Sequence, residues 1–468
     1  MPEHILFLTG RLAKPRVAKV LAAMQPADFT YDVQDVGVKV AALMTGDLIR
    51  RRLPAPVTAD RIMLPGRCRA DLAALSSHYG ILVLRGPDDV KDLPEFFGQK
   101  GKPRDLSRHD VRIFAEIVEA PTLDVAGILQ RADAYRRGGA DVIDLGCLPD
   151  TPFPHLAEAV QALAAAGHRV SVDSADVEEL RRGAQAGAHY LLSLTEETLS
   201  LADDTAAVPI LIPARHGDLD SLLRAMDRLD AAGRPYLADP ILDPIHFGFM
   251  DSLMRYATLR RLRPRAEILM GTGNLTELTD ADSTGVTAVL MGIVSELHIT
   301  NVLVVQVSPH CRRAVPETDA ARRLMFAARE EGSLPSGIGN ALLCLRDRKP
   351  LPTASAEIAE MAALVGDDNF RVEIAEDGIH VYNRQGHHVA AGAFELFPGL
   401  GVEADGSHAF YLGHELTKAQ IAWQLGKRYV QDQPLDWGVA VDRAPEDLEH
   451  FKAAGTTLQA KRKNRGKR

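Results

Sequence analysis

Short apolar segments alternate with amphipathic ones along the central part of the chain, from about Val111 to Gly332. Seven amphipathic segments with helical spacing lie between eight strand-length segments, at 112–118, 141–145, 169–173, 190–194, 209–212, 236–241, 267–271 and 301–307. Apolar runs of this kind are typical of parallel sheets covered on both faces. Eight βα units in about 220 residues predict a closed (β/α)₈ barrel, the TIM barrel. An open doubly wound sheet is the alternative, and the count of eight strands disfavours it.

The two ends of the chain have other patterns. In residues 1–105 helical segments alternate with strand-length segments at 5–9, 31–36, 61–64 and 81–85, which predicts a doubly wound α/β domain. The polar stretch 98–110 indicates a linker to a barrel domain at 110–335. The remaining residues, 336–468, predict a small α+β domain with a basic tail, with helices at 356–365 and 416–430 and antiparallel strands at 370–375, 378–383 and 388–391.

Charge and composition exclude several classes of protein. The net charge of −9 argues against a protein that coats nucleic acid. We interpret the basic tail as a solvated end, with a weak anion or nucleic-acid contact as the alternative. No apolar segment reaches the ~20 residues of a membrane span, and the first apolar run is too short for a signal peptide. The four cysteines, Cys68, Cys147, Cys311 and Cys344, lie far apart and form no CxxC pair, so neither a zinc ribbon nor a redox motif is expected. A reduced, cytoplasmic protein is the simplest interpretation of these features.

Candidate chemistry gathers where the predicted strands end, which is where (β/α)₈ enzymes have their active sites. These positions are rich in carboxylates and poor in lysine. The residues expected at the mouth of the barrel are Glu116, Asp144, Asp173, Ser193, Asp239, Asp243, Gly271, Thr272, Gly273, Asn274, Gln306 and Ser308. Carboxylates in a dry pocket suit a flat heterocycle with several N–H donors, such as a pterin, and they could also hold Mg²⁺. The structural alternative for each residue is a strand-end side chain that caps a helix.

The Gly-Thr-Gly-Asn sequence at 271–274 follows the seventh predicted strand. In barrels of this kind the loops after strands seven and eight often bind phosphate through backbone N–H groups. The position of the motif, more than its composition, therefore predicts a phosphate contact.

Four motifs of the barrel resemble those of the dihydropteroate synthase family. GADVIDLG at 139–146 resembles the family's GAdiIDiGg strand, and RVSVDS at 169–174 resembles its vSVDT strand. GAHY at 187–190 is similar to the start of its GAdiIND strand, and LDPIHFGF at 242–249 is similar to its lDPGiGFgK loop. The resemblance covers the barrel, about half of the chain, and it implies a pterin-binding barrel.

The sequence also departs from that family. Glu116 stands where the family has an Asn at the end of strand one, so the resemblance makes Glu116 the candidate ligand of Mg²⁺. Leu-Ser at 192–193 replaces the Asn-Asp of strand four, and Gly-Asn-Leu at 273–275 replaces the Ser-Arg-Lys after strand seven. Residues 306–310 replace the Arg-Val-His of strand eight. The groups that hold pyrophosphate and aminobenzoate in ordinary synthases are therefore missing, and the folate reaction is not expected.

The chain more closely resembles a divergent group of dihydropteroate-synthase-related proteins from archaea and methylotrophic bacteria. The similarity includes MGTGNLTEL at 270–278, DAD at 280–282 and YLGHEL at 411–416. That group is associated with tetrahydromethanopterin, a carrier of one-carbon metabolism. The resemblance implies a transferase of tetrahydromethanopterin biosynthesis, which condenses a 6-hydroxymethyl-dihydropterin diphosphate with a ribosylated aminobenzene.

This resemblance also implies roles for the residues at the mouth. Asp144, Asp173 and Asp243 would bind the pterin, while Thr272 and Asn274 would face the diphosphate or the pterin. Asp173 and Asn274 are the expected catalytic residues. The other expected substrate contacts are Ser193, Asp239, Gly271, Gly273, Gln306 and Ser308. A homodimer is a further implication of the resemblance. The charge and the short apolar segments predict no nucleic-acid or membrane partner.

Two other functions remain open. Pterin methyltransferases resemble the same barrel and have an Asn in the loop after strand seven, where Asn274 lies. Because the chain has no DxHxxG motif, such an enzyme would need a separate corrinoid-binding partner. The third interpretation is a non-catalytic pterin-binding scaffold, for which loss of the phosphate-binding lysine and arginine would be neutral.

Overall fold

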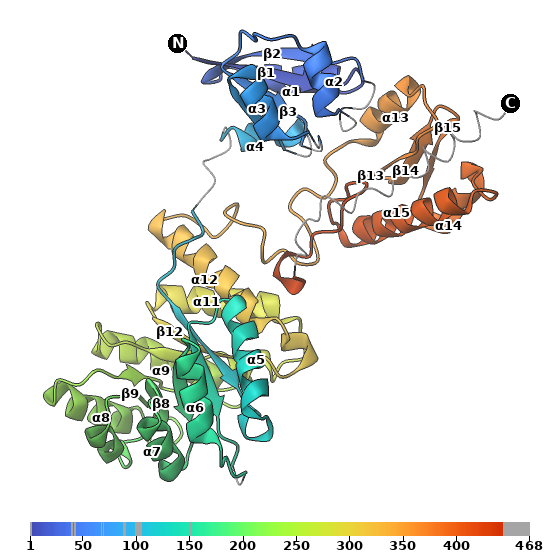
Figure 1. Cartoon of the computed structure of the whole chain (residues 1–468). Helices are drawn as coiled ribbons and strands as arrows, with labels where there is room; N and C mark the ends of the chain where they lie inside the picture. The colour runs from blue at the N-terminus through green and yellow to red at the C-terminus, as the bar shows by residue number, and fades with distance from the viewer. Residues whose placement is uncertain are drawn as a thin grey trace. The chain divides into compact units, whose positions relative to one another are not determined.

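The computed structural model describes residues 2–38, 41, 44–66, 68, 70–87, 90–98, 105–149 and 151–442. The chain divides into two compact units, residues 1–105 and 106–468 (Figure 1). The basic tail that the sequence suggests at 461–468 lies outside the described residues. Among the described residues, no helix is both long enough and apolar enough to cross a membrane. The predicted division at 335 stays a prediction.

The first unit is built on a four-stranded parallel sheet in the order β2-β1-β3-β4. Side chains of β1 alternate between two apolar clusters: Ile5 and Phe7 pack with helix α1, while Leu6 and Leu8 pack with helices α2 and α3. The strands are β1 (Glu3–Thr9), β2 (Phe29–Asp35), β3 (Arg61–Leu64) and β4 (Leu82–Arg85). The helices are α1 (Lys14–Ala23), α2 (Gly46–Arg52), α3 (Leu72–Tyr79) and α4 (Leu93–Phe96).

The second unit contains an eight-stranded parallel sheet that is nearly closed into a barrel (Figure 1). Its order is β10-β9-β8-β7-β6-β5-β12-β11, and a bridge between Ala238 and Ile268 links its two edges. The predicted eight-stranded parallel barrel sheet is confirmed. The strands are β5 (Arg112–Ile117), β6 (Val142–Gly146), β7 (Arg169–Asp173), β8 (Tyr190–Leu194), β9 (Val208–Leu211), β10 (Leu237–Ala238), β11 (Leu269–Gly271) and β12 (Asn301–Val305).

Helices connect and surround these strands. Asp124, Asp176 and Asp218 each accept a backbone N–H bond at the start of a helix, which fixes where α5, α7 and α8 begin. The helices are α5 (Val125–Arg137), α6 (Leu156–Ala165), α7 (Val177–Gln185), α8 (Leu219–Ala231), α9 (Phe249–Leu262), α10 (Gly273–Thr276), α11 (Ser283–Glu296) and α12 (Ala314–Glu330). The connection from β8 to β9 differs from the expected pattern, because it contains only the 3₁₀ helix Leu199–Asp204.

The inside of the barrel is filled below its mouth. Phe114, Val142, Tyr190, Leu192 and other apolar side chains form a separate interior cluster. The rings of Phe114 and Tyr190 meet edge to face, with their centroids 5.0 Å apart. The barrel interior is therefore a packed core below the rim.

A three-stranded antiparallel sheet follows the barrel in the chain. Helix α15 (Gly406–Leu425) packs on it through a shared apolar cluster, and it begins ten residues before the expected start at 416. Asp405 caps its first turn and Gly426, at φ +72°, ends it. The other elements are α13 (Ser355–Leu364), β13 (Arg371–Ala375), β14 (Gly378–Asn383), β15 (Gly386–Ala390) and α14 (Ala393–Leu396).

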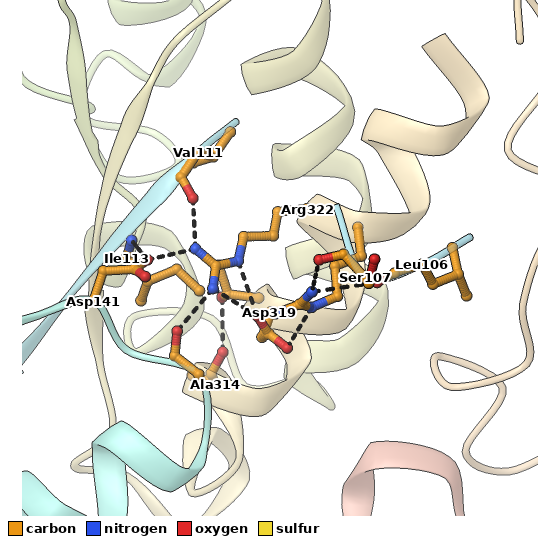
Figure 2. Close-up of polar contacts among 11 residues, drawn as sticks. Leu106, Ser107, Val111, Ile113, Asp141, Ala314, Asp319 and Arg322 are labelled. Atoms are coloured by element: carbon orange, nitrogen blue, oxygen red, sulfur yellow. Dashed lines mark hydrogen bonds and ion pairs between the residues drawn. The ribbon is translucent and has the colours of Figure 1, made fainter. Parts of the chain in front are cut away.

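A buried arginine of α12 ties the last helix of the barrel to its first strands (Figure 2). The Arg322 side chain is 2% exposed and pairs with Asp141 and Asp319. It also donates to the carbonyl oxygens of Val111, at 2.5 Å, and Gly139, at 2.9 Å. Asp141 in turn accepts the N–H of Ile113 at 2.9 Å. The N-terminal ends of β5 and β6 and the helix α12 are thus joined by one hydrogen-bonded network.

We predict that Arg322→Met lowers the free energy of unfolding of the barrel unit by about 3–5 kcal/mol, because the substitution breaks a buried ion-pair network: it removes the pairs with Asp141 and Asp319 and the hydrogen bonds to two carbonyl oxygens. Arg323→Met is the matched control: Arg323 lies on the same helix and also bonds Asp319, but its side chain is 26% exposed. Arg323→Met should lower the free energy of unfolding by less than half as much as Arg322→Met. Urea unfolding followed by circular dichroism measures both values, and equal losses for the two variants would contradict the prediction.

Candidate functional site

A cavity of about 210 Å³ opens at the rim of the barrel where the strands end. Glu116 lies near the end of β5, Asp173 is the last residue of β7, and Gly271 is the last residue of β11. Polar groups and aliphatic walls share the surface, whose lining residues are Glu116, Asp173, Leu192, Ser193, Ile212, Asp239, Ile241, Leu242, Gly271, Gly273, Asn274, Leu303 and Val305. The cavity is therefore at the C-terminal face, where the sequence predicts the site.

Three carboxylates crowd together at this rim. One oxygen each of Glu116, Asp144 and Asp173 lie within 4.8 Å of one another. The register of the sheet causes the crowding, since Glu116 is opposite Asp144 across β5 and β6, and Asp173 is opposite Gly146 across β6 and β7. This is the one group of described residues with metal-ligand spacing.

Gly146 is needed for this arrangement. A Cβ atom at Gly146 would lie 2.6 Å from Oε1 of Glu116 and 3.1 Å from the Cα of Val118. Any larger residue would therefore push the Glu116 carboxylate away from Asp144. The last glycine of the 139–146 motif therefore has a packing role that the sequence pattern alone does not reveal.

Asp144 lies behind the surface of the cavity. Its side chain is fully buried, and neither carboxylate oxygen has a hydrogen-bond partner among the described residues. It is also absent from the described residues that line the cavity. Asp144 therefore has no surface in the cavity through which it could make the predicted contact with a pterin. Its carboxylate lies beside those of Glu116 and Asp173.

Burial and mutual repulsion raise the pKa values of these groups. Burial, with smaller effects from the charges of Asp173 and Glu119, raises the pKa of Glu116 to about 8. Burial raises the pKa of Asp173 to about 6, and the hydroxyl of Ser193, 2.9 Å away, opposes that shift. The pKa of Asp144 is well above its usual range for the same reasons, burial first. Near neutral pH the cluster therefore retains protons or requires a positive charge beside it.

Asp239 follows β10 and forms another part of the cavity wall. Its Oδ1 accepts the hydroxyl of Tyr256 at 2.6 Å and the N–H of Ile241 at 2.7 Å. Ile241 has φ +65°, a left-handed conformation that is strained for a β-branched residue. Arg255 donates to the carbonyl oxygen of Ile241 at 2.9 Å and holds the turn from its other side. Burial raises the pKa of Asp239 to about 6.

Asp243 does not line the cavity. It is buried in an ion pair with Arg255, at 2.7 Å, and its other oxygen lies 2.9 Å from Nε2 of His216. Asp239, three residues before the motif that resembles the synthase loop, is the aspartate that faces the cavity. Asp243 fixes the loop that follows.

The Gly-Thr-Gly-Asn turn supplies three lining residues. Gly271, Gly273 and Asn274 face the cavity, whereas Thr272 is buried and donates to the carbonyl oxygen of Leu303 at 3.1 Å. Nδ2 of Asn274 donates to the carbonyl oxygen of Leu242 at 2.8 Å, which leaves Oδ1 without a partner among the described residues. The side-chain amide therefore joins the loops after β10 and β11.

Gln306 and Ser308 lie beyond β12 and outside the cavity lining. Gln306 accepts the N–H of Val315 at 2.8 Å, at the start of α12. The N–H of Ser308 donates to Glu277 at 2.9 Å, and Val307 donates to the same carboxylate at 2.8 Å. These two predicted substrate contacts instead hold the rim together.

Sequence reasoning missed several residues of the site. Tyr256 orients Asp239 from a helix, and Glu277 ties the loop after β12 to the 271–274 turn; neither sits at a strand end. The aliphatic wall was missed because apolar strand-end residues are indistinguishable in sequence from core residues; it consists of Leu192, Ile212, Ile241, Leu242, Leu303 and Val305. No described lining residue carries a positive charge. The cavity therefore suits a flat ligand with N–H donors, or a bound cation.

The chain is similar to several known proteins. The model of a family described as "Family of unknown function (DUF6513)" matches residues 3–88. An uncharacterized protein of Methanocaldococcus jannaschii is 25% identical over 522 residues, which cover 92% of this chain and 98% of that protein. This chain is also similar to solved dihydropteroate synthases. The structure from Yersinia pestis is 21% identical, with 48% of this chain and 95% of that chain covered and a TM-score of 0.37.

Two more solved structures are similar over the same share of the chain. The dihydropteroate synthase of Coxiella burnetii in complex with pteroic acid is 14% identical, covering 47% of this chain and 94% of that chain at a TM-score of 0.39. The enzyme of Xanthomonas albilineans in complex with 7,8-dihydropteroate is 19% identical, covering 50% of this chain and 100% of that chain at a TM-score of 0.36.

The raised pKa of Glu116 predicts a pH-dependent stability. Because the folded-state pKa of about 8 lies above the ordinary 4.5, the folded protein binds more protons than the unfolded chain between these values. The contribution of this proton to the free energy of unfolding is complete at low pH and is lost as the pH rises through about 8. The free energy of unfolding then falls by up to about 1.4 kcal/mol per pH unit for one proton. With a chelator present, we expect the melting temperature of Glu116→Gln to fall less steeply with pH than that of the wild type.

The exposed Glu158 provides the control, since Glu158→Gln should keep the wild-type slope. Melting temperatures measured at intervals from about pH 5 to 9 give all three slopes. The same slope for Glu116→Gln and the wild type would show that Glu116 does not titrate in this range.

Proposed function

We propose that the protein is a pterin-binding transferase whose substrate site is the cavity at the C-terminal face of the barrel. One observation carries the proposal: Asp173 and Asp239 both line a cavity whose other walls are largely aliphatic. A pterin has an amino group and a ring N–H along one edge, and carboxylates are strong acceptors for such donors. Its flat faces would pack against side chains such as Leu242 and Leu303.

Two neutral groups complete the proposed recognition. Ser193 donates to Asp173 and so fixes the direction of that carboxylate. Oδ1 of Asn274 is available to accept a further N–H, because the amide nitrogen is already held by Leu242. Ser193 lies in β8 and Asn274 lies in the short helix α10 after β11, so the recognising atoms are held in place before a ligand arrives.

The more specific proposal is the condensing reaction of tetrahydromethanopterin biosynthesis, and the motifs at 270–278 and 411–416 support it. The aniline nitrogen of a ribosylated aminobenzene would form a bond to the pterin methylene as the C–O bond to diphosphate breaks. Diphosphate leaves with the bonding electrons, and the nitrogen loses its proton to water. The lining residues offer no positive charge to the leaving group, so Mg²⁺, with Glu116 among its ligands, would supply it.

Asp239→Asn tests the binding step. The variant keeps an acceptor for Tyr256 and Ile241 but removes the negative charge, so we expect about 10–100-fold weaker binding of 6-hydroxymethylpterin. Pterin fluorescence titrations measure the dissociation constants. Asp227→Asn is the matched control, because Asp227 is exposed on α8 outside the cavity. Equal affinities for Asp239→Asn and the wild type would remove Asp239 from the site.

Diphosphate release tests the reaction. The purified full chain is incubated with the dihydropterin diphosphate, Mg²⁺ and the phosphorylated ribosyl-aminobenzene, and we expect diphosphate to appear in step with the condensed product. Pterin binding without diphosphate release would contradict the condensing reaction.

The missing positive charge in the cavity favours a second candidate, a pterin methyltransferase subunit that works with a corrinoid partner. Such an enzyme transfers a methyl group and has no diphosphate to hold, so an acidic cavity with Asn274 at its wall would suffice. Methyl transfer from methyl-tetrahydromethanopterin to reduced cobalamin would identify this function. Pterin binding with neither reaction would identify a non-catalytic pterin-binding scaffold.

A further inference from the structure

We infer that Glu116, Asp144 and Asp173 form a binding site for one small divalent cation, Mg²⁺ or Mn²⁺, at the floor of the cavity. Binding of the ion follows from the geometry of the three side chains. Its role, to hold a phosphate oxygen of the substrate, rests on the proposed function. The inference extends the single candidate ligand Glu116 to a set of three.

The spacing of the three oxygens fits one ion. They lie within 4.8 Å of one another. Opposite ligands of an ion with bonds of about 2.1 Å are roughly 4.2 Å apart. Only one pair among three ligands can be opposite, and adjacent ligands are roughly 3 Å apart. Side-chain rotations that bring the oxygens closer together by about 1–2 Å would therefore place all three in contact with one ion.

Asp144 gives the strongest argument that the ligand is an ion. The buried hydroxyl of Ser171 opposes the rise in the pKa of Asp144, but neither of the buried carboxylate oxygens has a hydrogen bond of normal geometry among the described residues. An unpaired buried carboxylate is unfavourable, and native structures satisfy such groups with hydrogen bonds, protons or metal ions. An organic ligand in the cavity does not reach Asp144, because Glu116 and Asp173 line the surface and Asp144 does not. An ion is small enough to contact all three.

The chemistry of the ligands selects the type of ion. Three carboxylates offer hard, negatively charged oxygens, which suit Mg²⁺ and Mn²⁺ and leave further positions for water or substrate oxygens. A soft metal would require sulfur or nitrogen ligands. The nearest thiol, Cys147, follows Gly146 directly, but it interacts with Glu179 and is outside the three-residue group.

The inferred ion also accounts for the charge of the cavity. The described lining residues include three acids and no lysine, arginine or histidine, so a phosphate group alone would be repelled. A divalent cation bound to the three carboxylates would offset their negative charge at this point of the cavity and attract a phosphate oxygen. Gly146 keeps the Glu116 carboxylate in place for this role, since a Cβ there would lie 2.6 Å from its Oε1.

Mn²⁺ is the probe that tests the site without reference to activity. Electron paramagnetic resonance of free Mn²⁺, with equilibrium dialysis, measures binding to the full chain, and we expect one saturable site. Asp144→Asn should weaken Mn²⁺ binding by roughly 100-fold while preserving side-chain volume. The melting temperature of this variant without metal should equal or exceed that of the wild type, because one repelling charge is gone. Glu116→Gln, at a less buried position, is the second variant and should also lose binding.

Asp239→Asn is the matched control, since Asp239 lines the same cavity outside the three-residue group. It should bind Mn²⁺ within about twofold of the wild type while losing pterin affinity. Conversely, Asp144→Asn should keep pterin affinity when EDTA is present. These paired results separate failure of the metal site from failure of the pterin proposal.

Two results would overturn the inference. One is the absence of saturable Mn²⁺ binding by the folded wild-type protein at millimolar concentration near pH 8. The other is unchanged Mn²⁺ affinity in both Asp144→Asn and Glu116→Gln.

Discussion

Like-charge repulsion at the rim of the barrel is the constraint on which the candidate site depends. In-register pairing of β5, β6 and β7 brings three carboxylate oxygens within 4.8 Å of one another. The nearly closed sheet does not let these strands separate, and Phe114 and Tyr190 fill the interior below. The strands hold the three carboxylates close together, so positive charge or protons beside them stabilise the folded protein. A proton, a metal ion or the N–H groups of a ligand are the available sources.

The other wall of the site is held by internal hydrogen bonds. Asp239 keeps Ile241 in a strained left-handed conformation, and Arg255 fixes the carbonyl oxygens of the same turn. Asn274 joins this turn to the loop after β11. These bonds set the positions of the acceptors before a ligand binds, which lowers the entropy that binding must overcome. The strain at Ile241 is offset by the rigid loops around it.

The sequence predicted the architecture better than the orientation of side chains. Apolar strand-length segments and the amphipathic helical segments between them are local signals, so the eight-stranded barrel could be recognised. Which of two nearby aspartates faces the cavity is not local: Asp239 and Asp243 both precede a proline, and only the ion pair with Arg255 assigns Asp243 to the loop. The partners of Gln306 and the burial of Asp144 likewise depend on neighbouring strands and helices, which sequence spacing does not specify.

The location of Asp144 behind the cavity surface has a kinetic consequence. An ion that reaches this carboxylate must pass between Glu116 and Asp173, and a pterin seated against Asp173 and Asp239 would close that route. Association would then be ordered, with the metal entering the cavity before the organic substrate. Release would follow the reverse order, so the bound metal would remain with the protein through successive turnovers.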